Sequence, residues 1–228
     1  MSDFQFFLVR TESTRPQAKL KQLEFTSFLY VPWEAFKRWR EAPVPALSSG
    51  LNLIDTADSY GTGRLNGRSE SLLGGFIDAL PASRRSQLVV ATKLAPFPWR
   101  QGRRGFHRAF DASQKRLGGH LKRVQLHWST ARYAPWQEAA RLDGLADLVQ
   151  AQQVDELGVS NVGPRRLRWM QARLMERGVK LRSVQIQWSL LSPGLAQAQE
   201  VLDLAQSLDI EVLAYSPLAF GVLSCAPA

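Results

Sequence analysis

The sequence is poor in cysteine and in long apolar runs. Cys225 is the single cysteine among 228 residues, which excludes a disulfide within the chain and is typical of a reducing compartment. No run of about 18 apolar residues occurs, so we expect no membrane span. The N-terminus lacks an unbroken apolar core after a basic start and does not resemble a signal peptide. Organelle transit peptides are poor in acidic residues, but this N-terminus contains Asp3, Glu12 and Glu24. The basic residues nearby are typical of such peptides.

Two familiar ligand-binding signatures are missing as well. No Gly-x-Gly-x-x-Gly sequence follows an apolar strand, so a Rossmann domain is not indicated. No zinc-ligand spacing is present, and we predict no metal site.

Acidic residues are scarce in one segment of a chain whose net charge is +9. Residues 84–123 contain eleven lysines and arginines and a single acid, Asp111, so this segment alone carries +10. A solvated outer surface is the favoured interpretation. The alternative is a basic surface for an anionic partner, such as a cofactor phosphate, nucleic acid or an acidic protein. No RNA-binding aromatic signature accompanies the charge, so we expect no specific nucleic-acid binding.

Strand-like and helix-like stretches alternate from Leu51 onward. The predicted strands are residues 51–55, 88–93, 123–127, 156–160, 183–188 and 211–215. The predicted helices are residues 69–80, 105–117, 135–152, 164–177 and 194–208. Successive strands lie roughly 30 residues apart, which is the length of a βα unit. The pattern therefore predicts an α/β fold, a parallel (β/α) barrel with its helices outside.

Six predicted strands are fewer than the eight that close such a barrel. Phe4–Val9 and Phe25–Val31 are two candidates for one further strand, and Trp33–Arg40 between them and the barrel has a helical pattern. We therefore predict three regions. They are an irregular N-terminal segment at 1–49, an incomplete barrel at 50–223 and a tail at 224–228.

Side chains that can hold or transfer a proton stand at the ends of three successive predicted strands. These are Asp55, Lys93 and His127, and Tyr60 follows Asp55 by five residues. Taken singly, they have ordinary explanations as a turn carboxylate, a surface lysine, a core histidine and a loop aromatic. Taken jointly they favour an active site, because the carboxyl ends of parallel strands build the active site of a βα barrel.

Five short segments, in this order along the chain, resemble the aldo-keto reductase family. They are Asp55–Gly61, Ala91–Lys93, Gln125–Trp128, Gly158–Asn161 and Ala214–Leu218. The stretches that look closest to plastid and cyanobacterial members are Gly61–Glu70, Lys93–Trp99 and His127–Gln137. The resemblance covers about residues 50–223. Each motif alone is weak, whereas five in the right order at barrel spacing are specific.

The resemblance implies that an aldehyde or ketone carbonyl is reduced by hydride from a nicotinamide cofactor, NADPH. Tyr60 would donate the proton to the carbonyl oxygen. Lys93 would lower the pKa of the Tyr60 phenol, and Asp55, rather than Asp58, would hold Lys93 in place. His127 would orient the carbonyl through a hydrogen bond.

The resemblance also implies a set of cofactor-binding residues. Ser160, Asn161 and Gln185 would hold the nicotinamide carboxamide, and Tyr215 would stack on the nicotinamide ring. The pyrophosphate loop would begin with Ser216 and Leu218. Candidate pocket walls are Trp99, Trp128 and Trp188.

Relative to the family, the sequence is expected to be truncated at both ends, without the final barrel units. Two alternatives to a working reductase therefore stay open. One is a catalytically impaired fragment or non-catalytic binding relative, and the other is a basic partner-binding protein. The expected partner is a small-molecule carbonyl substrate whose identity the sequence does not indicate. The resemblance suggests the chloroplast, with the cytoplasm as the alternative.

Overall fold

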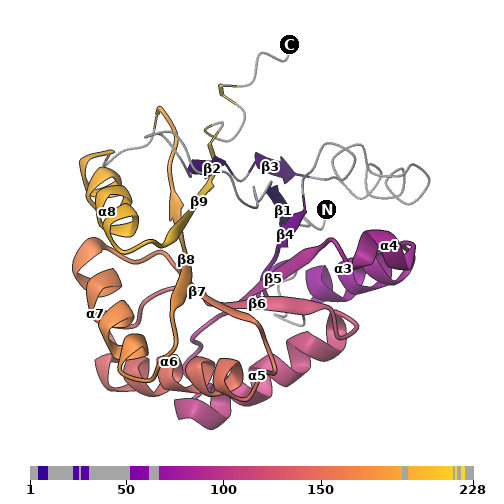
Figure 1. Cartoon of the computed structure of the whole chain (residues 1–228), viewed down its shortest axis with the longest axis horizontal. Helices are drawn as coiled ribbons and strands as arrows, with labels where there is room; N and C mark the ends of the chain where they lie inside the picture. Colours follow the sequence, from indigo (N-terminus) through magenta and orange to yellow (C-terminus); the bar gives the residue numbers. More distant parts are fainter. Residues whose placement is uncertain are drawn as a thin grey trace.

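The computed structural model describes residues 5–9, 23–25, 27–30, 52–61, 67–191, 195–217, 219 and 222–223. Six parallel strands form its centre. They are β4 (Leu53–Asp55), β5 (Val89–Leu94), β6 (Leu121–Leu126), β7 (Glu156–Ser160), β8 (Leu181–Gln187) and β9 (Glu211–Tyr215). Each strand pairs in parallel with the next one along the chain. The sheet curls into a half-barrel (Figure 1), which confirms the predicted incomplete parallel barrel.

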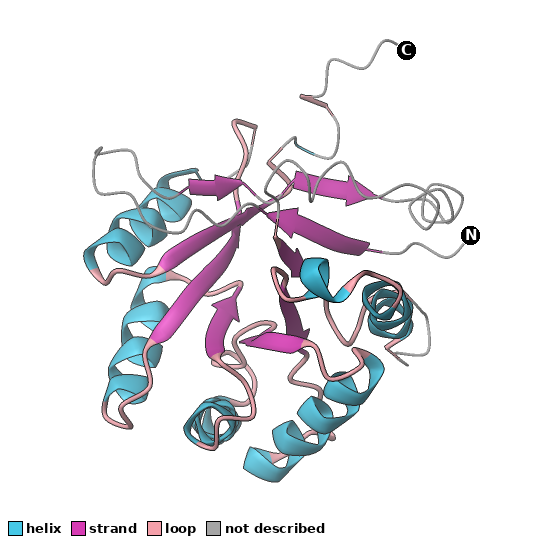
Figure 2. Ribbon diagram, turned by 45° about the vertical axis from the view of Figure 1, so that its right-hand side comes forward, coloured by secondary structure: helices cyan, strands magenta, loops and turns pink. Residues whose placement is uncertain are grey.

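The helices lie on the convex outer side of the curled sheet (Figure 2). They are α3 (Arg68–Asp78), α4 (Ala82–Arg85), α5 (Gly102–Arg116), α6 (Pro135–Gln150), α7 (Pro164–Met175) and α8 (Leu195–Ser207). Five of them fall within three residues of the predicted bounds at each end, whereas the short α4 was not predicted. None of the described helices is long and apolar enough to cross a bilayer.

Three further strands come from the segment before residue 50. They are β1 (Gln5–Val9), β2 (Leu23–Phe25) and β3 (Ser27–Tyr30). The β1 strand pairs antiparallel with both β3 and β4, and β2 pairs in parallel with β9. β1 and β3 fall on the two candidate segments Phe4–Val9 and Phe25–Val31, of which the sequence predicted only one as a strand, and both lie antiparallel to their neighbours. The helix predicted at Trp33–Arg40 lies outside the described residues.

The two faces of the sheet are buried in different ways, because successive side chains along a strand point to opposite faces. The outer face carries the large apolar core, in which Val90, Leu126 and Val159 pack with the helices. The inner face has a small apolar cluster of Leu53, Ala91 and Leu213. Closer to the carboxyl ends of the strands, the buried inner positions are polar. The sheet therefore holds a polar site above a small apolar base.

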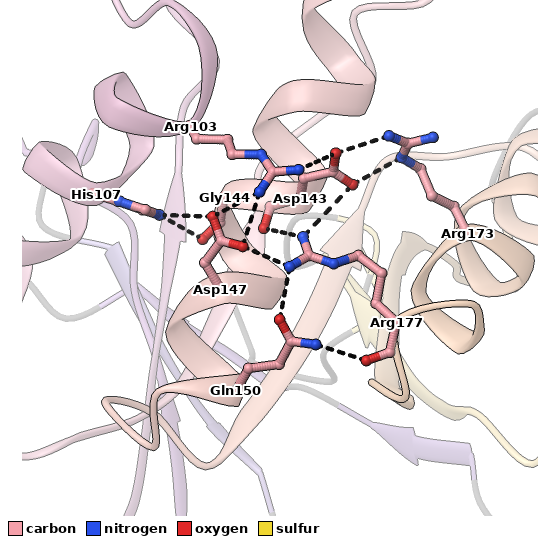
Figure 3. A network of polar contacts seen from close by, with 8 residues as sticks. All are labelled: Arg103, His107, Asp143, Gly144, Asp147, Gln150, Arg173 and Arg177. Carbon is pink, nitrogen blue, oxygen red and sulfur yellow. Dashed lines mark hydrogen bonds and ion pairs between the residues drawn. The ribbon is translucent and has the colours of Figure 1, made fainter.

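Helices α5, α6 and α7 are joined by an ionic network (Figure 3). Asp143 of α6 accepts hydrogen bonds from Arg103 of α5 at 3.0 Å and from Arg173 of α7 at 2.9 and 2.8 Å. Arg177, just beyond α7, donates to Asp147 at 2.6 Å. The charge of Arg103, which belongs to the basic segment 84–123, is thus paired with carboxylates of α6. This pairing agrees with the interpretation of the segment as an outer surface.

Candidate active site

Asp55 and Lys93 form a buried ion pair on the inner face of the sheet. Asp55 ends β4, Lys93 lies in β5, and both side chains are fully buried. The Lys93 ammonium donates a hydrogen bond from Nζ to Asp55 Oδ2. A buried charge costs several kcal/mol unless a partner compensates it. The pairing is the predicted one, and the neighbouring Asp58 pairs instead with Arg100.

Two glutamine amides complete the surroundings of the Asp55 carboxylate. Gln125 of β6 donates from Nε2 to Asp55 Oδ1 at 2.6 Å. Gln185 of β8 donates from Nε2 to Asp55 Oδ2 at 2.7 Å. Four strands therefore meet at one carboxylate, which accepts from one cation and two neutral amides.

Tyr60 lies on a turn shortly after β4. The ladder between β4 and β5 continues past the strand end, where the Asp58 N–H donates to the Lys93 carbonyl at 3.1 Å. The Tyr60 N–H then donates to the Ala57 carbonyl at 3.1 Å and closes the turn. This places the centre of the Tyr60 ring 5.1 Å from Lys93 Nζ and 5.6 Å from the centre of the His127 ring. The structure thus brings the four predicted residues together.

The pKa of the Tyr60 phenol is raised above its ordinary value. Burial is the main cause, and the Asp55 and Asp58 carboxylates raise it further. The sequence predicted the opposite direction, with Lys93 lowering this pKa. The prediction did not include the depth of burial or Asp58, and Asp55 compensates the Lys93 charge. At neutral pH the phenol therefore holds its proton, which is the form that a proton donor needs.

His127 follows β6 and is held by its backbone N–H, which donates to the Leu94 carbonyl at 3.1 Å. Its Nδ1 lies 3.3 Å from the hydroxyl oxygen of Ser59. Burial, and to a smaller extent the nearby Lys93 charge, lowers the pKa of His127 to about 3. The His127 imidazole is therefore neutral at neutral pH, and it can donate a hydrogen bond without adding charge. For Lys93 too, burial lowers the pKa, although Asp55 opposes this shift.

The residues that the resemblance assigns to the carboxamide are already linked to one another. Asn161 donates to Ser160 Oγ and to the His127 carbonyl, both at 3.1 Å. The Tyr215 hydroxyl donates to Asn161 Oδ1 at 2.7 Å. Ser160 Oγ lies 3.4 Å from Gln185 Oε1. These side chains therefore form one polar group that reaches from β7 to β9 and touches the catalytic candidates through His127.

A pocket of about 280 Å³ opens at the carboxyl ends of β7, β8 and β9, beside the first turns of α7 and α8. Its lining residues are Asn161, Val162, Gly163, Ile186, Gln187, Gln197, Ala198, Val201 and Tyr215. Asn161 and Tyr215 thus face open space, whereas Ser160 and Gln185 are buried behind them.

The remaining predicted residues fall in different places. Ser216, directly after β9, is buried and has a positive φ of 56°. Leu218 lies outside the described residues. Trp188 is partly buried and packs against the outer core, and it is not among the residues that line the pocket described above.

Aromatic side chains gather on the loops that follow β5 and β6. Phe97 stacks on Trp99 with ring centres 4.7 Å apart and meets the Trp128 ring edge-on at 6.0 Å. Trp128 lies 4.9 Å from the His127 ring and donates from Nε1 to the Tyr133 hydroxyl at 2.7 Å. Trp99 and Trp128, predicted as pocket walls, therefore belong to one aromatic cluster beside His127.

The sequence reasoning gave no role to Gln125, Ser59 or Arg100. Gln125 had a readable signal, because it is a polar residue two positions before His127 in an apolar strand and thus faces the inner side. Arg100 had none, since its ion pair with Asp58 joins two loops that are distant in the sequence.

The fold defines a parallel βα-barrel protein, and comparison with known families makes the class specific. The model of the aldo/keto reductase family matches residues 40–226. The chain therefore belongs to the aldo/keto reductase family, as its motifs predicted.

Among curated proteins, the chain is 48% identical to a chloroplastic pyridoxal reductase of Arabidopsis thaliana over 78% of its own length and 50% of that protein. It is 35% identical to a 6-dehydroglucose reductase of Novosphingobium aromaticivorans over 78% of its own length and 58% of that protein. The chain thus spans about half the length of the curated relatives it matches.

Solved structures of other proteins share the fold, and two of them illustrate the likeness. An aldo/keto reductase of Brucella melitensis is 26% identical, with a TM-score of 0.60 over 82% of this chain and 64% of that one. A thermostable aldo-keto reductase, Tm1743, crystallised with the inhibitor epalrestat, is 23% identical, with a TM-score of 0.67 over 85% of this chain and 64% of that one. The second likeness supports the fold alone.

Proposed function

We propose that this protein reduces the carbonyl group of a small aldehyde or ketone with NADPH and that Tyr60 donates the proton. One observation carries the proposal. The side chains of Tyr60, Lys93, Asp55 and His127 meet at the carboxyl ends of three successive parallel strands, where a βα barrel builds its active site. Membership of the family supplies the class of reaction.

The chemistry assigns a separate task to each of the four side chains. When bound, the nicotinamide would supply a hydride to the carbonyl carbon. Negative charge then grows on the carbonyl oxygen, and the proton moves to that oxygen from the Tyr60 hydroxyl. The Lys93 ammonium near the ring stabilises the phenolate that is left behind, and Asp55 keeps this ammonium in place. The neutral His127 ring donates a hydrogen bond that orients the carbonyl oxygen.

The polar group around Asn161 fits a nicotinamide carboxamide, which offers both a donor and an acceptor. Asn161 and Tyr215 line the pocket, and their side chains carry amide and hydroxyl groups. The amide nitrogen of Gln185 is already used by Asp55. We therefore assign direct contact with the carboxamide to Asn161, which lines the pocket, and propose that Ser160 and Gln185 hold Asn161 from behind through their hydrogen bonds.

For the substrate we propose an aromatic aldehyde. The plant relative is named a pyridoxal reductase, and pyridoxal is an aldehyde on a flat aromatic ring. The cluster of Phe97, Trp99, Trp128 and Tyr133 beside His127 offers faces for such a ring, and the Trp99 side chain is 64% exposed. Offset or edge-on ring contacts contribute about 0.5–1.5 kcal/mol each.

Two measurements test this proposal. NADPH is titrated against the intrinsic fluorescence of the seven tryptophans, and NADPH consumption is followed with pyridoxal and with an aliphatic aldehyde of similar size. We expect saturable quenching and faster turnover of pyridoxal. Absence of both quenching and turnover would overturn the proposal. Equal turnover of the two aldehydes would overturn only the preference for aromatic substrates.

We also propose a plastid location, which the chloroplastic plant relative supports. A fusion of the full-length protein to a fluorescent protein, expressed in leaf cells, should coincide with chlorophyll fluorescence. A diffuse cytoplasmic signal would contradict this location.

A further inference from the structure

Gln125 is a fully buried polar residue in the middle of the inner face of the sheet. The register of the strands places it beside Lys93 of β5 on one side and Gly158 of β7 on the other. Its side chain reaches across β5 to the Asp55 carboxylate of β4, with the 2.6 Å hydrogen bond described above. A buried polar side chain that spans two strands is expensive unless its hydrogen bonds compensate the burial.

Gly158 provides the space that Gln125 occupies. A Cβ atom at position 158 would lie 2.9 Å from Gln125 Cγ, 3.2 Å from Gln125 Oε1 and 2.5 Å from Ser183 Oγ. The backbone of Gly158 is not in the left-handed region, so its conformation does not require glycine. The lack of a side chain therefore serves packing, and the space is filled by Ser183 Oγ and by the side chain of Gln125.

The two oxygens of Asp55 are held differently. Oδ2 accepts from the Lys93 ammonium and from Gln185, whereas Gln125 donates to Oδ1. A donor on Oδ1 fixes the rotation of the carboxylate about its last bond. Because the amide is neutral, it does so without a second positive charge that would compete with Lys93 for Asp55.

We infer that Gln125 is a positioning residue of the active site. It holds the Asp55 carboxylate in the orientation that supports the Lys93 ammonium under Tyr60, and Gly158 makes room for it. The inference rests on the proposed reduction at Tyr60 and extends it to a residue that touches neither the carbonyl nor the reacting oxygen. The proposed chain of contacts runs from Gly158, which leaves space for Gln125, through Gln125 and Asp55 to Lys93.

The first test replaces the amide by an apolar side chain of similar size, in Gln125→Leu. Without the donor, Asp55 supports the Lys93 ammonium less well, so the pKa of Lys93 should fall by about one unit, the scale of one hydrogen bond to a charged group. We expect kcat for carbonyl reduction to fall about tenfold or more, with KM for NADPH nearly unchanged. The alkaline limb of the pH profile should move to lower pH.

The second variant, Gln125→Glu, keeps the shape of the side chain and makes its donor depend on pH. The charged groups that face this position are Asp55 from β4 and Lys93 from β5, whereas β7 and β8 present Gly158, Ser183 and Gln185, which do not titrate. A protonated carboxyl can donate to Asp55 as the amide does, but an ionised one repels it. Activity should therefore approach wild type at low pH and decline through a new titration as pH rises.

Two further variants separate positioning from general packing. Gly158→Ala should displace Gln125 and reproduce part of the loss seen in Gln125→Leu. The matched control is Ser183→Ala, which lies in the same row of the sheet and removes a buried hydroxyl that has no hydrogen-bond partner among the described residues. This control should leave kcat and the pH profile unchanged.

The titration of Lys93, followed by NMR with ¹³C-labelled lysine, supplies a readout that needs no turnover. A lower Lys93 midpoint in Gln125→Leu than in wild type supports the inference. An unchanged midpoint overturns the inference. The inference is also overturned if Gln125→Leu has the kcat and the pH profile of wild type while Tyr60→Phe is inactive. If wild type reduces no carbonyl, the proposed function fails, and the NMR titration alone decides the role of Gln125.

Discussion

The phenol of Tyr60 lies between one cation and two carboxylates, and this balance of charges decides its chemistry. Burial and the two carboxylates raise its pKa, so the resting residue is a phenol. In the proposed reduction, the Lys93 ammonium favours the phenolate that is left when Tyr60 donates its proton. Asp55 therefore has two opposing effects. It disfavours phenolate directly, but it favours the charged form of Lys93 against the effect of burial and holds the ammonium in place.

Asp55 and Lys93 should behave as one unit in a double-mutant cycle. Lys93→Met removes the cation that stabilises phenolate, and Asp55→Asn weakens the hold on that cation. Each should lower kcat by about a hundredfold, the scale of a general acid step. The double variant should lose little beyond the worse single variant. Strict additivity of the two losses would show that they do not share a role.

His127 should stay neutral well below its ordinary pKa. Its pKa in the folded protein is about 3, against 6.5 for a free histidine, because burial disfavours the charged ring. With a lowered folded pKa, its contribution to stability is complete above pH 6.5 and is lost as pH falls through about 3. Ring ¹⁵N shifts measured by NMR between pH 7 and pH 4 should show no protonation. A midpoint near 6.5 would mean that the ring is not buried as the structure has it.

At the scale of residues, the sequence predicted the four side chains that the structure brings together and the partner of Lys93. Asp55, Lys93 and His127 stand at or next to strand ends, and Tyr60 follows Asp55 in the same motif. Sequence reasoning missed the direction of the Tyr60 pKa, which depends on burial and on Asp58. It also gave no role to Gln125. The inward-facing position of Gln125 was readable from the alternation along the strand, but its partner lies 70 residues away and two strands over. Such contacts follow from the register between strands, which local sequence does not encode.

At the scale of elements, the outer helices depend on the ionic network of Figure 3. Burial alone would raise the pKa of Asp143, but hydrogen bonds from Arg173 and the charge of Arg103 hold it below its ordinary value. The network therefore stabilises the fold above about pH 4, the range of an unfolded aspartate, and this contribution is lost as pH falls through the lower folded pKa.

Asp143→Asn should lower the free energy of unfolding by about 1–3 kcal/mol, because it leaves the arginines of α5 and α7 without their shared charge. The arginines are partly exposed, so solvent limits the effect. Urea denaturation followed by circular dichroism measures it. The control is Asp209→Asn, whose side chain is 81% exposed in its pair with Lys180 and should change stability by less than about 0.5 kcal/mol. Equal effects would refute a structural role for the network.

Strands and helices were predicted correctly where the local spacing of apolar residues is clear. The six parallel strands and five long helices alternate with clear apolar spacing and capping signals, such as Pro135 and Pro164 in the first turns of α6 and α7. The antiparallel pairing of β1 with β4 was not predicted, because the direction in which a strand pairs depends on its neighbour in space. The short α4 has too few residues to show a helical period.

At the scale of the whole molecule, a half-barrel of six parallel strands carries the complete set of four side chains. The chain matches the family over residues 40–226 and spans about half the length of its curated relatives. The alternative of a catalytically impaired or purely binding relative makes a different prediction. Under that alternative, NADPH binds without turnover, and substitution of Tyr60 leaves the rate of NADPH consumption unchanged.

The most direct test of the account is therefore the rate of pyridoxal reduction by NADPH in wild type and in Tyr60→Phe. The substitution keeps the ring and removes only the hydroxyl, so NADPH affinity from tryptophan quenching should stay nearly constant. The account predicts that kcat falls by at least about a hundredfold. Measurable reduction at the same kcat in both proteins would contradict the assignment of Tyr60 as the proton donor and, with it, the central claim.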